Sequence, residues 1–180
     1  GTWTDASNNR KEGDTFYLGN TELRVGPIIK NGSERIATLE GRYDTYMTKA
    51  HEEITVDEST STDPEEYFVA TDYISGESYL LRANNFVEDN GINKVTFQYR
   101  KNGTWTDASN NRKEGDTFYL GNTELRVGPI IKNGSERIAT LEGRYDTYMT
   151  KAHEEITVDE STGTDPEEYF VATDYISGES

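Results

Sequence analysis

Several residue types that would define a fold or an activity are absent or scarce in this chain. It has no cysteine, two methionines and four prolines, so a small exported domain of this kind must be held by its core, by metals or by its neighbours. No stretch approaches the roughly 20 apolar residues that span a membrane, and no signal peptide is visible. The chain starts within a repeat period, so a targeting segment of a parent protein could lie outside it.

Signals of catalysis are also missing. The two histidines, His51 and His153, each precede two glutamates, but a zinc site needs several ligands in reach. The sequence has no Gly-rich phosphate loop and no Gly-x-Ser-x-Gly motif. With 34 acidic residues, some carboxylate pair is always available, so such a pair does not indicate glycoside hydrolysis. We predict that the protein is not an enzyme and has no catalytic residues.

Positive charge is scarce as well. The chain has 18 Lys and Arg residues against 34 Asp and Glu residues, and its formal net charge is −16. An acidic surface disfavours nucleic acids and anionic membranes, which attract Lys and Arg. It favours solubility and divalent cations, although a solvated surface without a specific partner is the simpler interpretation.

What the sequence does contain is a long internal repeat. Residues 1–78 and 103–180 are identical except that Ser61 corresponds to Gly163, and residues 79–102 occur once. The period of 102 residues is longer than the roughly 20–47 residues of solenoid repeats. It suits a small independent domain, so we predict domains in series and not a stacked solenoid.

Two registers divide the chain into copies. In the first, residues 1–102 form one copy, made of an acidic unit and a strand pair, and residues 103–180 form a truncated second copy. In the alternative register, residues 1–78 are a partial copy and residues 79–180 a complete one.

Short β-prone segments dominate the sequence, and no window holds a sustained helical periodicity. Leu23 and Val25 alternate with polar residues before Pro27 interrupts the strand, and Asn31-Gly32 is a strong hairpin signal,. A polar segment over Asn84–Asn93 is expected to join two strands. About seven to nine short strands per period predict an all-β fold of tandem β-sandwich modules, Ig-like or jelly-roll-like.

The segment that occurs once, Tyr79–Asn102, contains a strand pair that needs a sheet. It carries a net charge of +2, against −9 for each flanking copy. One strand pair between two copies leaves one copy with an open sheet edge, and such edges recruit other strands. We therefore expect one of two arrangements. Either the chain is a segment of a longer array of repeats, or successive chains complete one another's sheets head to tail. A third alternative is a 78-residue fold that is complete alone, with this segment as an ordered connector.

Acid-rich loops offer oxygen ligands for Ca²⁺, although neither loop follows the twelve-residue calcium-binding pattern. A solvated acidic loop is the alternative for each. The candidate ligands are Asp57, Glu58, Asp63, Glu65 and Glu66, their equivalents Asp159, Glu160, Asp165, Glu167 and Glu168, and the separate pair Glu88 and Asp89.

Three Asn-x-Ser/Thr triplets begin at Asn31, Asn102 and Asn133. Each lies at an expected turn, where a glycan would be accessible. They predict glycosylation if the protein is exported.

The stretch from Glu12 to Val25, with its repeat from Glu114 to Val127, resembles the opening of β-rich repeat domains of archaeal surface-layer and cell-envelope proteins. In both, an aromatic residue and Leu-Gly precede a Leu-x-Val strand. The resemblance implies an exported β-sandwich protein that assembles outside the cell, and it transfers no catalytic residue.

These observations predict an extracellular or cell-surface structural protein whose partners are other copies of itself. It would form a fibre, sheath, surface layer or adhesin stalk from near-identical modules. The alternative is a carbohydrate-binding module of a surface adhesin that uses exposed aromatic residues. Trp3, Trp105, Tyr43 and Tyr46 are the candidates for that role.

Overall fold

The computed structural model describes residues 2–43, 45–49, 51, 53–59, 66–151, 153, 155–161 and 169–180. All of its named elements are β-strands, and every pairing between them is antiparallel. The all-β prediction is therefore confirmed. Within the described part of the chain, no helix has the length and apolar character needed to cross a membrane.

In chain order the strands are β1 (Thr15–Leu18), β2 (Thr21–Asn31), β3 (Glu34–Arg42), β4 (Thr45–Lys49), β5 (Glu53–Asp57), β6 (Phe68–Asp72), β7 (Ser78–Asp89), β8 (Ile92–Lys101), β9 (Thr104–Arg112), β10 (Thr117–Leu120), β11 (Thr123–Asn133), β12 (Glu136–Gly143), β13 (Thr147–Lys151), β14 (Glu155–Asp159) and β15 (Phe170–Asp174).

The strands in the middle of the chain, from β5 to β13, pair among themselves in two sheets. One sheet has the order β13-β6-β7-β8-β9 and the other the order β10-β11-β12-β5. Both sheets contribute to one hydrophobic core, whose members run from Ile54 to Leu141. We call this contiguous part, residues 53–151, the complete unit.

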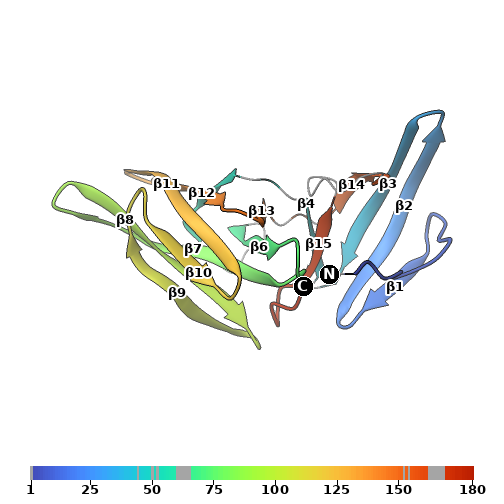
Figure 1. Ribbon diagram of the computed structural model, residues 1–180, viewed down its shortest axis with the longest axis horizontal. Coiled ribbons are helices and arrows are strands. Elements are labelled where there is room, and N and C mark those ends of the chain that lie inside the picture. Colours follow the sequence, from blue (N-terminus) through green and yellow to red (C-terminus); the bar gives the residue numbers. More distant parts are fainter. Residues whose placement is uncertain are drawn as a thin grey trace.

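The two ends of the chain form a second unit together. Its sheets have the orders β1-β2-β3-β14 and β15-β4. The pairing of β14 with β3 and of β15 with β4 repeats the pairing of β5 with β12 and of β6 with β13. We call this part the open unit; in Figure 1 it lies beside the complete unit, with both chain ends near β15.

The chain passes between the units twice, after Lys49 and after Lys151. These two positions are one period apart, so the stretch of chain between them is one repeat and forms one complete unit. Of the positions expected as boundaries from the sequence, Ser78 begins β7, and Asn102 lies in the turn between β8 and β9.

Phe97 occupies the centre of the complete core. Its ring packs edge-to-face on Phe68, at a centroid distance of 6.3 Å, and stacks on Phe118 at 5.3 Å. Phe68 and Phe118 belong to opposite sheets, and all three rings are buried. Because fully burying a Phe side chain contributes about 1.5–3 kcal/mol, this contact is a main link between the sheets.

The local expectations are met in part. The interruption at Pro27 is confirmed, since the register between β2 and β3 shifts between Val25 and Ile28. The Asn31-Gly32 hairpin is present, with Asn31 opposite Glu34 across the turn.

The prediction of a loop over Asn84–Asn93 is wrong. β7 continues to Asp89 through a bulge between Ala83 and Phe86, and the chain turns at Asn90-Gly91, where both residues have positive φ. The turn signal of Asn90-Gly91 was therefore stronger than the polarity of the segment around it.

We expect limited trypsin digestion to cut first beside Lys49 and Lys151, because cleavage concentrates where a chain links separately packed units. The product should be residues 50–151, with the complete core intact, identified by intact mass. Lys101 is an internal control because it lies beside the boundary expected at residue 102. Cleavage there before cleavage at the two crossings would contradict the division into these units.

Candidate docking site

The second sheet of the open unit is smaller than its counterpart. In the complete unit, β6 lies between β13 and β7, whereas among the described strands β15 pairs with β4 alone. The strands equivalent to β7 and β8 have no copy in the open unit, because residues 79–102 occur once. Thr2–Arg10 has the same sequence as β9 but forms no strand.

Identical residues show what this difference does to burial. Phe68 is 0% exposed in the complete unit, and its equivalent Phe170 is 37% exposed in the open unit. Phe118 is likewise buried, while its equivalent Phe16 is only partly buried. Phe97, which contacts both phenylalanines in the complete unit, has no equivalent in the open unit, because residues 79–102 occur once. The open unit keeps a smaller buried core and has an open apolar face at Phe170.

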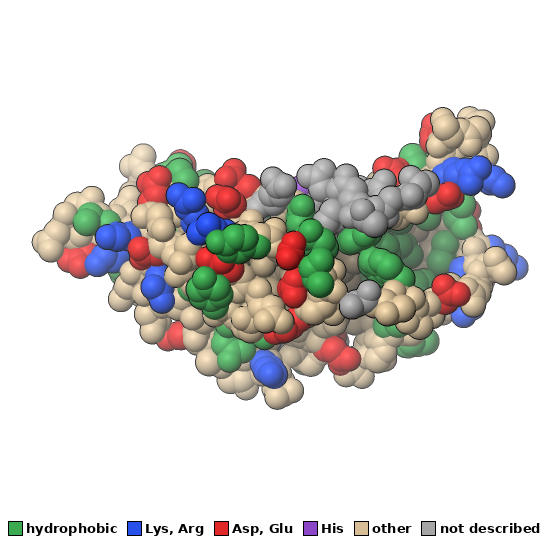
Figure 2. Space-filling view, viewed as in Figure 1, with side chains coloured by type: hydrophobic (Ala, Val, Ile, Leu, Met, Phe, Trp, Pro, Cys, Tyr) green, Lys and Arg blue, Asp and Glu red, His purple; other side chains and the backbone are tan. Residues whose placement is uncertain are grey.

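A groove of about 470 Å³ lies along β15. Its lining includes Trp3, Leu18 and Phe170 from the open unit, and Tyr73 and Tyr148 from the complete unit. In Figure 2, hydrophobic side chains line a recess on the side of the molecule that holds the open unit. An apolar groove beside an edge strand can accept a further strand through backbone hydrogen bonds and side-chain contacts.

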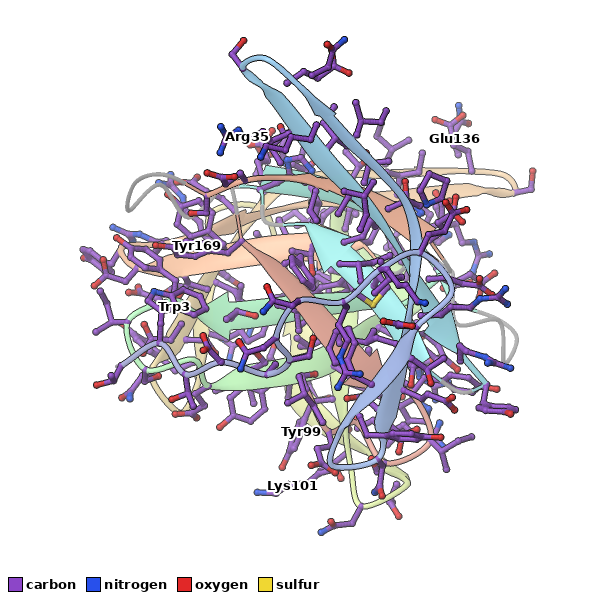
Figure 3. The ribbon with its side chains drawn as sticks, turned by 90° about the vertical axis from the view of Figure 1, so that its right-hand side faces the viewer. Trp3, Arg35, Tyr99, Lys101, Glu136 and Tyr169 are labelled. Atoms are coloured by element: carbon purple, nitrogen blue, oxygen red, sulfur yellow. The ribbon has the colours of Figure 1, made fainter. Side chains whose placement is uncertain are left out.

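Trp3 and Tyr169 stand together at this groove (Figure 3), with ring centroids 4.8 Å apart. The equivalent pair in the complete unit, Trp105 and Tyr67, has the same edge-to-face arrangement at 5.0 Å. The pair is therefore preserved in both units.

The two tryptophans differ in what covers them. Arg82 and Arg100 place their guanidinium groups over the Trp105 ring, at 4.4 and 5.3 Å from its centroid. Both arginines belong to β7 and β8, which have no copy in the open unit. Trp3 is accordingly 77% exposed.

A pair of glutamates shows the same contrast. The Glu58 carboxylate accepts a hydrogen bond from the Phe86 backbone N–H at 2.9 Å and pairs with Arg137 at 3.2 Å. Its equivalent, Glu160, makes the matching ion pair, with Arg35 at 3.3 Å. The side chain of Glu58 is 13% exposed and that of Glu160 is 51% exposed.

The candidate calcium ligands are dispersed where the structure describes them. Asp57 and Asp159 end their strands in exposed positions, Glu66 is half-buried, and Asp89 at the end of β7 pairs with Lys94 at 2.9 Å. Glu88, beside Asp89, is exposed. Asp63, Glu65, Asp165, Glu167 and Glu168 lie outside the described residues. Among the described ones, no three His, Asp or Glu side chains are grouped closely enough to hold a metal ion, and calcium binding stays a prediction.

The other candidates occupy varied positions. Asn31, Asn102 and Asn133 are exposed at or beside turns, so a glycan would find room at each. Tyr43 is exposed, Trp105 is covered by two arginines, and the side chain of Tyr46 lies outside the described part.

Several tyrosines lie beside carboxylates, which favour the neutral phenol. A hydrogen bond to Glu77 raises the pKa of Tyr79 to about 12, and burial adds to the shift. Hydrogen bonding to Glu22 similarly raises the pKa of Tyr17, and its repeat Tyr119 is raised by Glu124. These phenols are neutral hydrogen-bond donors at physiological pH, which suits a structural role.

No protein-family model, no curated protein and no solved structure matches this chain. The fold and the open face therefore define its class on their own: an all-β repeat protein with one complete and one incomplete unit. The resemblance to surface-layer repeat domains stays a prediction.

The identical phenylalanines allow a direct test of the open face. Phe68→Ala should destabilise the complete unit by about 3–5 kcal/mol, the usual cost of removing a buried Phe. Phe170→Ala, the same change at the equivalent position, should cost less than half of that because the ring is already partly in water. Thermal unfolding followed by near-UV circular dichroism would measure both. Equal losses would mean that Phe170 is as well packed as Phe68.

Calcium binding has a separate test. If the acid-rich loops hold Ca²⁺, chelation should lower the unfolding midpoint, since a ligand at a hundredfold excess over its Kd stabilises a fold by about 2.7 kcal/mol. Calorimetry with EDTA and with added Ca²⁺ measures this difference, and Mg²⁺ is the control. An unchanged midpoint would remove calcium from the description of the protein.

Proposed function

We propose that this chain is part of an extracellular structural protein whose near-identical units associate into a fibre, sheath, surface layer or adhesin stalk. The supporting observation is the pairing of β14 and β15 with β3 and β4, far away in the sequence. β5 and β6 have the same sequence and make the same pairing in the complete unit. Either segment can therefore serve the same acceptor strands.

Because β5–β6 and β14–β15 are interchangeable, two chains can associate through strand pairings that already exist within each chain. The β14–β15 segment of one copy can pair with β3 and β4 of a second copy, and the contacts are those already made within the chain. Such a contact is heterologous, because donor and acceptor surfaces differ, and it continues from chain to chain as an open filament. Each unit would then be a bead of a tandem β-sandwich array, and the number of units would set its reach.

The closed arrangement competes with this assembly. The connections between the units, from Lys49 to Glu53 and from Lys151 to Glu155, are short. Short tethers hold a segment at effective concentrations of the order of millimolar near its own acceptor. Filaments should therefore form where copies are crowded, as on a surface, and dilute chains should close on themselves.

Disulfide trapping distinguishes the two arrangements. Thr157 of β14 lies directly opposite Thr38 of β3, and the chain has no other cysteine to interfere. We expect the Thr38→Cys/Thr157→Cys variant, refolded at high concentration and oxidised, to give a ladder of disulfide-linked oligomers on a non-reducing gel. At low concentration it should give a cross-linked monomer.

The chain contains its own control for this experiment. Thr55 and Thr140 are the equivalent pair inside the contiguous complete unit, so Thr55→Cys/Thr140→Cys should cross-link within one chain at any concentration. Monomers alone from both variants at all concentrations would contradict assembly by strand exchange.

A further inference from the structure

The hairpin of β7 and β8 is the element that separates the complete unit from the open unit. We propose that the open face along β15 is a docking site for a second copy of this hairpin, residues 79–102. The inference rests on the proposed function, because a further hairpin can come only from another repeat of the same protein. It deepens that function by naming the partner surface.

The register of docking follows from the complete unit. There Phe68 lies opposite Leu81 and Ala70 opposite Tyr79, in the pairing of β6 with β7. Since β15 has the sequence of β6, Phe170 should lie opposite Leu81 of the docked copy and Ala172 opposite Tyr79. The ring of Phe97 from that copy would then enter between Phe170 and Phe16.

The open unit contains the residues equivalent to those that hold the hairpin in the complete unit. Glu160 corresponds to Glu58, whose carboxylate accepts the Phe86 N–H. The backbone carbonyl of Ile28 corresponds to that of Ile130, which accepts a hydrogen bond from Asn93 at 3.2 Å. Trp3 corresponds to Trp105, which Arg82 and Arg100 cover.

Charge supports the same occupant. The segment over residues 79–102 has a net charge of +2, and each flanking repeat has −9. A docked hairpin thus brings positive charge to the more acidic part of the protein, and Arg82 and Arg100 lie among the residues that carry it. Electrostatic complementarity of this kind favours association and the correct register.

Exchange of hairpins between existing copies cannot satisfy the open face. Residues 1–180 have two places for the hairpin, one in each unit, and residues 79–102 fill one. A copy that donates its hairpin to another copy leaves its own complete unit without one. The number of units that hold a hairpin therefore stays constant. The occupant must therefore be an added hairpin, and association of two unmodified chains through hairpin exchange gains no burial.

Trp3 provides the experimental signal. In a Trp105→Phe variant of the full chain, Trp3 is the one remaining tryptophan. Titration with a synthetic peptide of residues 79–102 should shift its emission to shorter wavelength and reduce its quenching by acrylamide, with one peptide bound per chain. The matched control is the same peptide with Phe97→Ser, which should bind at least a hundredfold more weakly because it lacks the ring that fills the gap.

An isolated hairpin is marginally stable in water, so a covalent version accompanies the peptide. A second copy of residues 79–102 joined after Ser180 should protect Trp3 in the same way. It should also slow amide hydrogen exchange over Thr2–Arg10, which would pair with the added strand as β9 pairs with β8. The control extension again carries the Phe97→Ser change.

Each outcome of the peptide and extension experiments either supports or overturns the docking site. Protection of Trp3 by the native hairpin but not by the altered one supports the docking site. No protection by either the peptide or the extension overturns it, as does equal protection by native and altered sequences. Protection that grows with protein concentration in the absence of peptide would mean that open faces cover one another, and would also overturn it. The Thr38→Cys/Thr157→Cys experiment reports on strand exchange independently, so failure of one proposal does not imply failure of the other.

Discussion

The insertion of Phe97 between Phe68 and Phe118 is the contact on which the complete unit depends. It joins a ring from each sheet through a third ring that comes from the segment present once in the chain. Where that segment is available, the surrounding apolar residues of both sheets are buried. Where it is not, a smaller core stays buried and the equivalent Phe170 is partly exposed. A single hairpin thus decides whether the ring at the position of Phe68 is fully buried, and packing density in such cores leaves little room for a missing ring.

The repeat shows in one molecule which features follow from local sequence and which do not. Strands β1 and β10 have the same bounds within their copies, and so do β2 and β11, because their alternation and turns are encoded locally. Thr104–Arg112 is a strand and Thr2–Arg10 is not, although the two sequences are identical. The difference is the presence of β8 as a neighbour, which no analysis of the segment itself could reveal. Whether this segment forms a strand depends mainly on the neighbouring strand and only weakly on its own residues.

The candidate site was predictable in outline. The apolar residues of Tyr79–Asn102 and its single occurrence predicted a strand pair that two copies would need, and an open edge in one of them. The position of that edge at β15 was not predictable, because it depends on where the chain passes between units. Sequence identity hides those crossings: any 102-residue window has nearly the same composition. Glu58 illustrates the limit for single residues, since its acidic neighbourhood suggested calcium while its carboxylate binds Arg137 and the backbone of β7.

Periodicity itself explains why an open face can persist in such a protein. In a repeat with one hairpin per period, every unit that lies between two full periods has its own hairpin, and an imbalance arises only at a terminus of the array. An exposed β edge is ordinarily selected against because it promotes aggregation. Under the proposed function, the same edge would be the surface where units are added, and its sequence is already matched to the incoming segment. Identity between repeats then has a physical benefit, because each donor fits each acceptor, and a physical cost, because exchange between equivalent strands is equally well matched.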